Sequence, residues 1–194
     1  MIEVAILRSY QTTLWSILIS CCINFAAINH AYSIEIVRET AISATNSSYD
    51  GQDLIINGVT LMIDGSHQFN SVQLINGAVL THSLSPATKL EITSNTFFID
   101  ANSRIDLTGK GHLPTLAVTG ASGGSYGGLG GVYETGGTTN RVFGNTALPT
   151  DLGIGGIGSA GKTHGGGSIK LTTNELTVDG QIIANGQDFN TFFS

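Results

Sequence analysis

From Ile34 onward, apolar and polar residues alternate in short segments of the kind that form β-strands. β-branched and aliphatic runs occupy positions 54–56, 60–63 and 72–75. Asn-Gly and Asp-Gly pairs, which favour tight turns with a positive φ, separate such runs. These pairs stand at 50–51, 57–58, 64–65, 76–77, 179–180 and 185–186. No segment keeps a 3.6-residue apolar period for three turns, so the pattern predicts an all-β fold.

Two internal repeats indicate that the strands belong to stacked equivalent units. The segment 55–61 (IINGVTL) recurs further along the chain as 74–80 (LINGAVL). The segment 91–100 matches 170–179, apolar against apolar, except that Phe98 corresponds to Thr177. A period of about 20 residues suits one coil of a β-solenoid, in which each strand pairs with its equivalent in the next coil. The sequence therefore predicts a β-solenoid, with a β-sandwich as the alternative.

The repeat also assigns side chains to the interior of the solenoid. Inward positions on one strand stack on the inward positions of the coils above and below it. The residues expected to point into the core are Ile92, Phe97, Ile99, Ile105, Leu107, Leu171, Leu176, Val178 and Ile182.

A glycine-rich stretch, residues 109–167, interrupts this pattern. It holds 20 of the 26 glycines of the chain. Because the matched repeats lie on both sides of it, we interpret it as an insert within a single domain of residues 34–194. We expect the insert to be ordered and anchored by its large side chains, with a mobile insert as the alternative. The expected anchors are Tyr126, Leu129, Tyr133, Phe143 and Leu148.

Residues 1–33 have the pattern of an export signal. Arg8 precedes the uncharged apolar run 14–28, and Ala31 and Ser33 are small residues suited to cleavage. The run is shorter than the roughly 20 apolar residues that span a bilayer. The sequence therefore predicts a signal peptide at 1–33, with an uncleaved anchor or lipidation at Cys21 as alternatives. Both cysteines, Cys21 and Cys22, lie in this run, so the processed chain would form no disulfide.

Residues 156–163 (GIGSAGKT) match the nucleotide-binding P-loop literally. A functional P-loop follows a buried strand and opens a helix whose N-terminal amides hold the phosphates. Here Pro149 interrupts the preceding residues, and His164 and the glycines at 165–167 cannot sustain a helix. We expect no nucleotide binding. Nucleic-acid binding is also not expected, because the net charge is −6 and basic residues are not clustered.

No catalytic, cofactor-binding or metal-binding residue is assigned. His67, His82, His112 and His164 lack the spacing of a metal site. Stacked coils can align Asp100, Asp106 and Asp179, and paired carboxylates perform glycoside hydrolysis. Arg104 and Lys170 are the candidate basic residues beside them, and both are expected to be exposed. A polysaccharide-acting enzyme therefore stays an alternative, while a protein without catalysis is the main expectation.

The order of four blocks resembles glycine-rich β-helix segments of large exported bacterial adhesin-like and pectin-lyase-like proteins. The resemblance covers roughly residues 54–187. It implies a right-handed parallel β-helix of few coils and an extracellular or envelope setting, and it implies no catalytic residues. The blocks are 123–131 (GGSYGGLGG), 149–156 (PTDLGIGG), 165–171 (GGGSIKL) and 176–186 (LTVDGQIIANG).

These observations together predict an exported β-solenoid module with a structural or adhesive role, either secreted or in the cell envelope, at the outer surface or in the periplasm. The expected partners are an extracellular polysaccharide or another envelope protein, with membrane contact only through the N-terminal segment if that segment is not cleaved. No cofactor is expected. The chain stops at Ser194, shortly after a segment that would feed the next coil. A truncated copy of a longer protein, or pairing with another chain, is expected on that ground.

Overall fold

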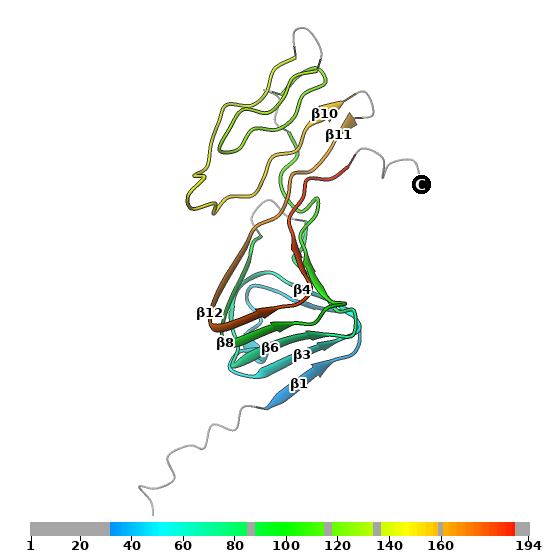
Figure 1. The fold of residues 1–194 in the computed structure, drawn as a ribbon, viewed down its shortest axis with the longest axis vertical. Coiled ribbons are helices and arrows are strands. Elements are labelled where there is room, and N and C mark those ends of the chain that lie inside the picture. Colours follow the sequence, from blue (N-terminus) through cyan, green and yellow to red (C-terminus); the bar gives the residue numbers. More distant parts are fainter. Residues whose placement is uncertain (1–31, 85–87, 115–117, 134–136, 159–160, 189–194) are drawn as a thin grey trace, which may run out of the picture. The chain divides into compact units, whose positions relative to one another are not determined.

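The computed structural model describes residues 32–84, 88–114, 118–133, 137–158 and 161–188 (Figure 1). The described residues belong to one compact unit. The predicted signal peptide lies outside the described residues, except for Tyr32 and Ser33. Ser33 begins β1 (Ser33–Ile36) and pairs with Asp53. Cleavage after Ser33 would therefore remove the first residue of this strand.

Two parallel sheets contain the long strands (Figure 1). The first sheet has the order β1-β3-β6-β8-β12, and β5 also pairs with β8. Its strands are β1, β3 (Asp53–Asn57), β5 (Gly65–Gln68), β6 (Ser71–Ile75), β8 (Leu90–Ile99) and β12 (Ile169–Val178). The second sheet has the order β13-β9-β7-β4-β2. Its strands are β2 (Thr40–Ile42), β4 (Thr60–Ile63), β7 (Val79–Thr81), β9 (Arg104–Asp106) and β13 (Gln181–Ile183).

Apart from β5, which precedes β6 in the same sheet, the chain alternates between the two sheets. We call one strand of the first sheet and the next strand of the second sheet a layer, so the layers are β1/β2, β3/β4, β6/β7, β8/β9 and β12/β13. Among the described residues there is no α-helix, and the one short helical turn is the 3₁₀ helix η1 (Ser47–Tyr49). The all-β prediction is confirmed. The sheets do not have the antiparallel pairing on which β-sandwiches are built.

The pairing of β8 with β12 confirms the longer repeat. Ile92 lies beside Leu171, and Phe97 lies beside Leu176, in the register that the sequence match predicts. These two strands come from opposite sides of the glycine-rich stretch. The stretch is therefore an excursion from a single sheet system.

The strand register that the shorter repeat predicts is correct in the second sheet and wrong by one residue in the first. Leu61 pairs with Leu80, as predicted, but Leu74 pairs with Ile56 and not with Ile55. A slip of one residue exchanges the two faces of a strand, and the burial of Ile56 and Leu74 decides the register. The additional residue is accommodated at Asn76, which adopts a φ of 58° before Gly77.

The predicted turn glycines have two different roles. A positive φ is found at Gly51, Gly58, Gly65 and Gly77, as the turn dipeptides require. Gly180 and Gly186 do not have a positive φ, so the prediction is wrong there. At Gly180 the reason is space, because a Cβ would lie 2.1 Å from the carbonyl oxygen of Ser103.

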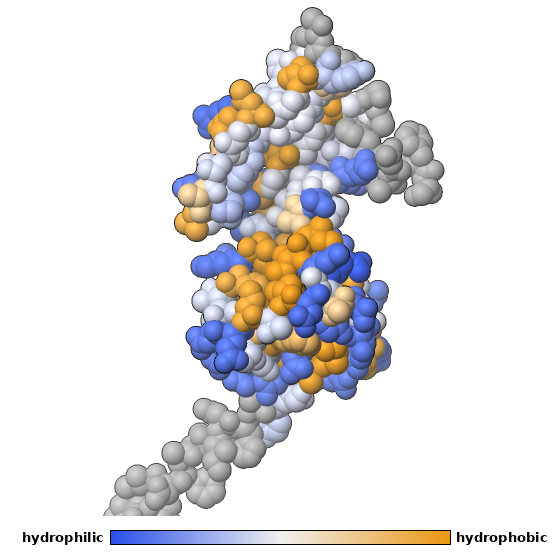
Figure 2. All heavy atoms as spheres, viewed as in Figure 1, coloured by the Kyte–Doolittle hydropathy of each residue, from blue (hydrophilic) through white to orange (hydrophobic). Residues whose placement is uncertain are grey.

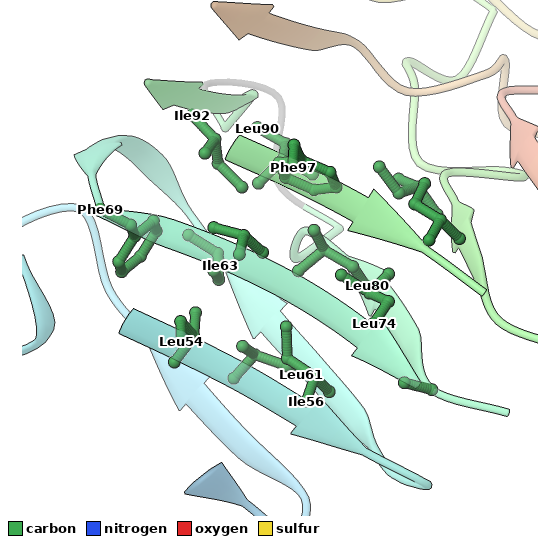
Figure 3. Packing of buried hydrophobic residues seen from close by; sticks show 14 of the residues in the cluster. Leu54, Ile56, Leu61, Ile63, Phe69, Leu74, Leu80, Leu90, Ile92 and Phe97 are labelled. Atoms are coloured by element: carbon green, nitrogen blue, oxygen red, sulfur yellow. The ribbon is translucent and has the colours of Figure 1, made fainter. Parts of the chain in front are cut away.

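Apolar side chains from both sheets meet between them and form the core (Figure 3). Of the predicted core residues, Ile92, Phe97, Ile99, Ile105 and Leu107 are no more than 2% exposed. For the other four residues the predicted burial in the core is wrong. Leu171 is half-buried, while Leu176, Val178 and Ile182 are 40–50% exposed. These side chains face the same way as the buried ones, but no described strand lies beyond β12 and β13.

Side-chain amides connect the layers on the outside of the first sheet. Asn95 Nδ2 donates to Asn70 Oδ1 at 3.0 Å, and Asn174 Nδ2 donates to Asn95 Oδ1 at 3.3 Å. Asn70 Nδ2 in turn donates to Asp53 Oδ1 at 2.6 Å. We call these three asparagines the asparagine ladder. The ladder lies in the middle of β8 and β12, where the regular alternation of inward and outward side chains is interrupted. In β8 the inward-facing residues are Ile92 and Ser94 before this point, and Phe97 and Ile99 after it.

Backbone contacts hold the glycine-rich insert together. Gly111 N donates to Gly165 O at 2.7 Å, and Gly153 N donates to Gly166 O at 2.9 Å. A Cβ on Gly111 would lie 2.4 Å from two carbonyl oxygens, so these segments pack at a distance that only glycine permits. The described residues of the insert therefore pack against one another, while its order in solution stays a prediction.

The expected anchors of the insert are correct in part. Tyr126 and Phe143 stack edge to face, with ring centroids 5.1 Å apart. Leu129, Tyr133 and Leu148 are wrong as anchors, because they are 74%, 90% and 66% exposed. Contacts between glycine backbones hold other parts of the insert, as do buried polar side chains such as Asn140, whose Oδ1 accepts from Ser125 N at 2.7 Å.

Candidate functional site

A groove with a volume of about 690 Å³ lies in the glycine-rich insert. Its framework is a set of extended segments around Ser122, which bridges Val132 on one side and Ile157 on the other. The lining also includes Tyr133, His164 and Gln187. We call this surface the insert groove. A volume of this size accommodates a small ligand or a few units of a chain.

Backbone hydrogen bonds fix the polar side of the insert groove. Gln187 N donates to His164 O at 2.8 Å, and His164 N donates to Gln187 Oε1 at 3.2 Å. His164 Nδ1 donates to Gly111 O at 2.9 Å. In the neutral ring Nε2 is then a hydrogen-bond acceptor. The half-buried imidazole and the amide of Gln187 are therefore held in place before any ligand binds.

The other side of the insert groove carries an exposed aromatic ring. Tyr133 N donates to Ala121 O at 2.8 Å, which fixes the backbone, while the side chain is 90% exposed. Val132 beside it is 50% exposed. Among the described residues that line the groove, none carries a carboxylate, an ammonium or a guanidinium group. The surface combines an aromatic face with amide, hydroxyl and backbone groups, and it is close to neutral.

The described parts of the P-loop match contain two short paired strands. Strands β10 (Ile157–Gly158) and β11 (Gly161–Lys162) pair antiparallel, and Thr163 N donates to Gly156 O at 3.0 Å. Lys162 Nζ lies 3.5 Å from the carbonyl oxygen of Pro114. No helix follows Thr163 in the described residues, so the segment lacks the helix N-terminus that holds phosphates in P-loop proteins. The predicted lack of nucleotide binding stays a prediction.

The candidate carboxylates hold turns and neighbouring side chains. Asp100 accepts from Asn76 N at 2.7 Å and from Asn102 N at 3.0 Å. Hydrogen bonds from the Ser103 hydroxyl, and then from these amides, hold the pKa of Asp100 below its usual range. A general acid for glycoside cleavage needs a raised pKa, so Asp100 does not fit that role.

Asp106 is also unsuited to act as an acid. Arg104 Nε donates to Asp106 Oδ2 at 3.2 Å within the same strand. Burial acts to raise the pKa of Asp106, but hydrogen bonds from Thr108 and Arg104 outweigh it, and the pKa lies below its usual range. Asp179 comes directly after β12, beside the end of β8, where its N–H donates to Ile99 O. Lys170 is exposed and pairs with Glu91 in the register of the sheet.

The histidines occupy separate places. His67 Nδ1 lies 3.0 Å from Asp50 Oδ1, and His82 is fully buried beside Gly167. His112 begins the insert, where its carbonyl accepts from Gly155 N and Gly165 N. Within the described part of the chain, no three His, Cys, Asp or Glu residues are grouped as metal ligands. Nor does any described helix have the length and apolar character needed to cross a membrane.

A second groove, of about 310 Å³, runs along the asparagine ladder. It is lined by polar residues such as Gln68, Thr93 and Thr172. The amides of the ladder already bond to one another across the layers. The insert groove is therefore the better candidate for ligand binding.

Sequence reasoning misses the insert groove. It places Tyr133 among the anchors of the insert, and it does not single out Gln187. The groove depends on close backbone contacts between segments far apart in the chain, such as Gly156 against Ser122. Glycine composition does not specify these pairings. The one usable signal is an aromatic residue in a stretch with few large side chains.

Comparison with known proteins gives no further guide to the site. No family model matches the chain, and no curated protein or solved structure matches it. The likeness to exported bacterial β-helix proteins therefore stays a prediction from the sequence.

Proposed function

We propose that the layers are successive coils of a right-handed parallel β-helix, and that the chain is a binding module of the cell surface without catalysis. The alternation between two parallel sheets and the pairing of both internal repeats support the β-helix. The apolar segment before β1 supports export. The lowered pKa values of Asp100 and Asp106 count against the alternative of a polysaccharide-cleaving enzyme.

We propose a neutral polysaccharide as the ligand, bound in the insert groove. The observation that carries this proposal is the exposed ring of Tyr133 at the rim of a groove without charged side chains. Sugar rings present apolar C–H faces that pack on aromatic rings, and hydroxyl groups that bond to amides and backbone groups. His164 Nε2 and Gln187 would supply the polar contacts. A net charge of −6 further favours neutral over acidic polysaccharides.

Substitution of Tyr133 tests this function. Purified protein would be incubated with insoluble neutral polysaccharides, and the bound fraction measured by sedimentation. We expect Tyr133→Ala to weaken binding about five- to thirty-fold, since loss of an aromatic contact costs roughly 1–2 kcal/mol. Tyr133→Phe should bind nearly as well as the original chain, because the ring face is retained.

The matched control is Leu129→Ala, which removes a side chain that is 74% exposed and does not line the groove. It should leave binding unchanged. If no neutral polysaccharide is retained, or if Leu129→Ala loses as much binding as Tyr133→Ala, the insert groove is not a polysaccharide site.

A further inference from the structure

The end of the two sheets at β12 and β13 is uncovered among the described residues. β12 pairs with β8 on one edge only, and β13 pairs with β9 on one edge only. The inward-facing Leu176, Val178 and Ile182 are 50%, 40% and 42% exposed. Figure 2 shows hydrophobic residues gathered beside β12. This end combines open backbone edges with apolar side chains, which together favour pairing with another chain.

The opposite end of the sheets is different. The inward-facing Ile36 and Ile42 of the first layer are only 7% and 1% exposed. Tyr49, in the connection that follows β2, packs against the same core. The first layer is therefore covered by its own chain. A head-to-tail contact would place the exposed end against a covered one, whereas contact between two β12 ends would cover both.

The inward apolar positions of β12 are arranged symmetrically along the strand. Ile169 and Leu171 lie beside Leu90 and Ile92 of β8, which are buried. Leu176 and Val178 lie beside the buried Phe97 and Ile99. These four apolar positions are equally spaced on either side of the midpoint between Thr173 and Asn174. An antiparallel second copy would place Ile169 opposite Val178 and Leu171 opposite Leu176.

The charges on the outer face of β12 suit the same register. Lys170 and Glu175 are both exposed. In the antiparallel register Lys170 lies opposite Thr177 of the second copy, one diagonal step from its Glu175. Diagonal neighbours across strands are within reach of long side chains. Two-fold symmetry repeats this Lys–Glu contact, so each end of the paired strands gains one.

We propose that two copies of the chain join at this end and form a closed dimer with two-fold symmetry, in which β12 pairs antiparallel with β12 and the two Ile182 side chains meet. This dimer is independent of the proposed polysaccharide site.

The first test is the mass of the purified protein at micromolar concentration, measured by light scattering after size-exclusion chromatography. We expect a dimer. Leu176→Asp should raise the dimer dissociation constant at least about tenfold, because it places a charge in the centre of the interface. Val37→Asp is the matched control: Val37 is 56% exposed and follows β1 at the other end. It should leave the dimer intact.

Charge exchange at two exposed residues outside the core, Lys170 and Glu175, provides a second test. Lys170→Glu should weaken the dimer several-fold, because the introduced carboxylate would face Glu175 of the second copy. The combined variant Lys170→Glu, Glu175→Lys should restore it. Circular dichroism and thermal unfolding would verify that each variant is folded.

Three results would overturn the proposal. One is a monomer for the original chain at these concentrations. Another is a mass that grows continuously with concentration, which would indicate an open head-to-tail assembly. The third is a dimer that Leu176→Asp leaves unchanged, or that the exchanged charges fail to restore.

Discussion

His82 is the buried residue whose polar groups are least satisfied in the described structure. The ring is fully buried, and Nδ1 donates to Ser83 O at 2.8 Å. Nε2 has no hydrogen-bond partner and lies beside the Cα of Gly167, where a Cβ would approach it to 2.4 Å. Burial lowers the pKa of His82 from the usual value of 6.5. Removal of the ring from solvent disfavours its charged form, so the folded chain favours the neutral imidazole.

This residue should make the protein less stable in mild acid. Below pH 6.5 the unfolded chain binds a proton at position 82 that the folded chain does not, so the free energy of unfolding falls until the lowered pKa is reached. Each pH unit of that window costs about 1.4 kcal/mol. Urea unfolding between roughly pH 5 and pH 8 measures the slope. In His82→Gln the slope over this range should be reduced, whatever the loss of stability at pH 8. An unchanged slope would show that another group titrates.

At the scale of the elements, the asparagine ladder joins β8 and β12 to Asn70, which comes directly before β6. Asn95 both donates and accepts within it, so its side chain connects the layers on either side. The ladder stands where the inward-facing positions shift from Ile92 and Ser94 to Phe97 and Ile99. Its amides therefore fix the register at the point where the alternation of a strand no longer does so.

Removal of the central amide should destabilise the sheet measurably. Asn95→Ala loses two side-chain hydrogen bonds, and we expect the free energy of unfolding to fall by about 1 kcal/mol. Asn102→Ala removes another exposed asparagine side chain, which lies outside the ladder, and should change stability by less than about 0.5 kcal/mol. Urea denaturation of both variants checks the difference. Equal losses would mean that the ladder contributes no specific stability.

The sequence was sufficient for the strands, for the register of the longer repeat and, in the second sheet, for that of the shorter repeat. Apolar alternation located the strands, and the match across the insert paired Ile92 with Leu171 correctly, because those segments have equal lengths between their turns. The match between 55–61 and 74–80 gave the wrong register between β3 and β6, where one additional residue near Asn76 shifts the pairing. The sequence also placed Leu176 and Ile182 in the core. Burial depends on what covers a strand, and the pattern of a strand does not report that.

At the scale of the whole molecule, the insert leaves and rejoins the sheets at neighbouring points. Gly111 N and Gly165 O are 2.7 Å apart, and Gly167 N donates to Leu107 O at 2.9 Å. The described residues between these points make no strand of either parallel sheet. The core between the sheets is assembled from side chains outside the insert. The sheets therefore have what they need to fold without it.

Replacement of residues 112–164 by a short Gly-Ser linker should preserve the two parallel sheets, because a linker of a few residues spans the gap. Circular dichroism should show a β spectrum and cooperative thermal unfolding. This variant should lose polysaccharide binding and keep the proposed dimer, so it separates the two proposals. A chain that does not fold would show that the insert contributes to the core.

The position of the insert also affects the order in which the chain folds. Within the earlier layers, partners such as Leu61 and Leu80 are separated by one layer of chain, whereas the whole insert separates Ile92 from Leu171. Closing the longer loop costs about 1 kcal/mol more in chain entropy. We expect β1 to β9 to assemble as one kinetic unit and β12 to join it afterwards. During synthesis, the edge of β8 would therefore stay unpaired until the whole glycine-rich stretch has left the ribosome.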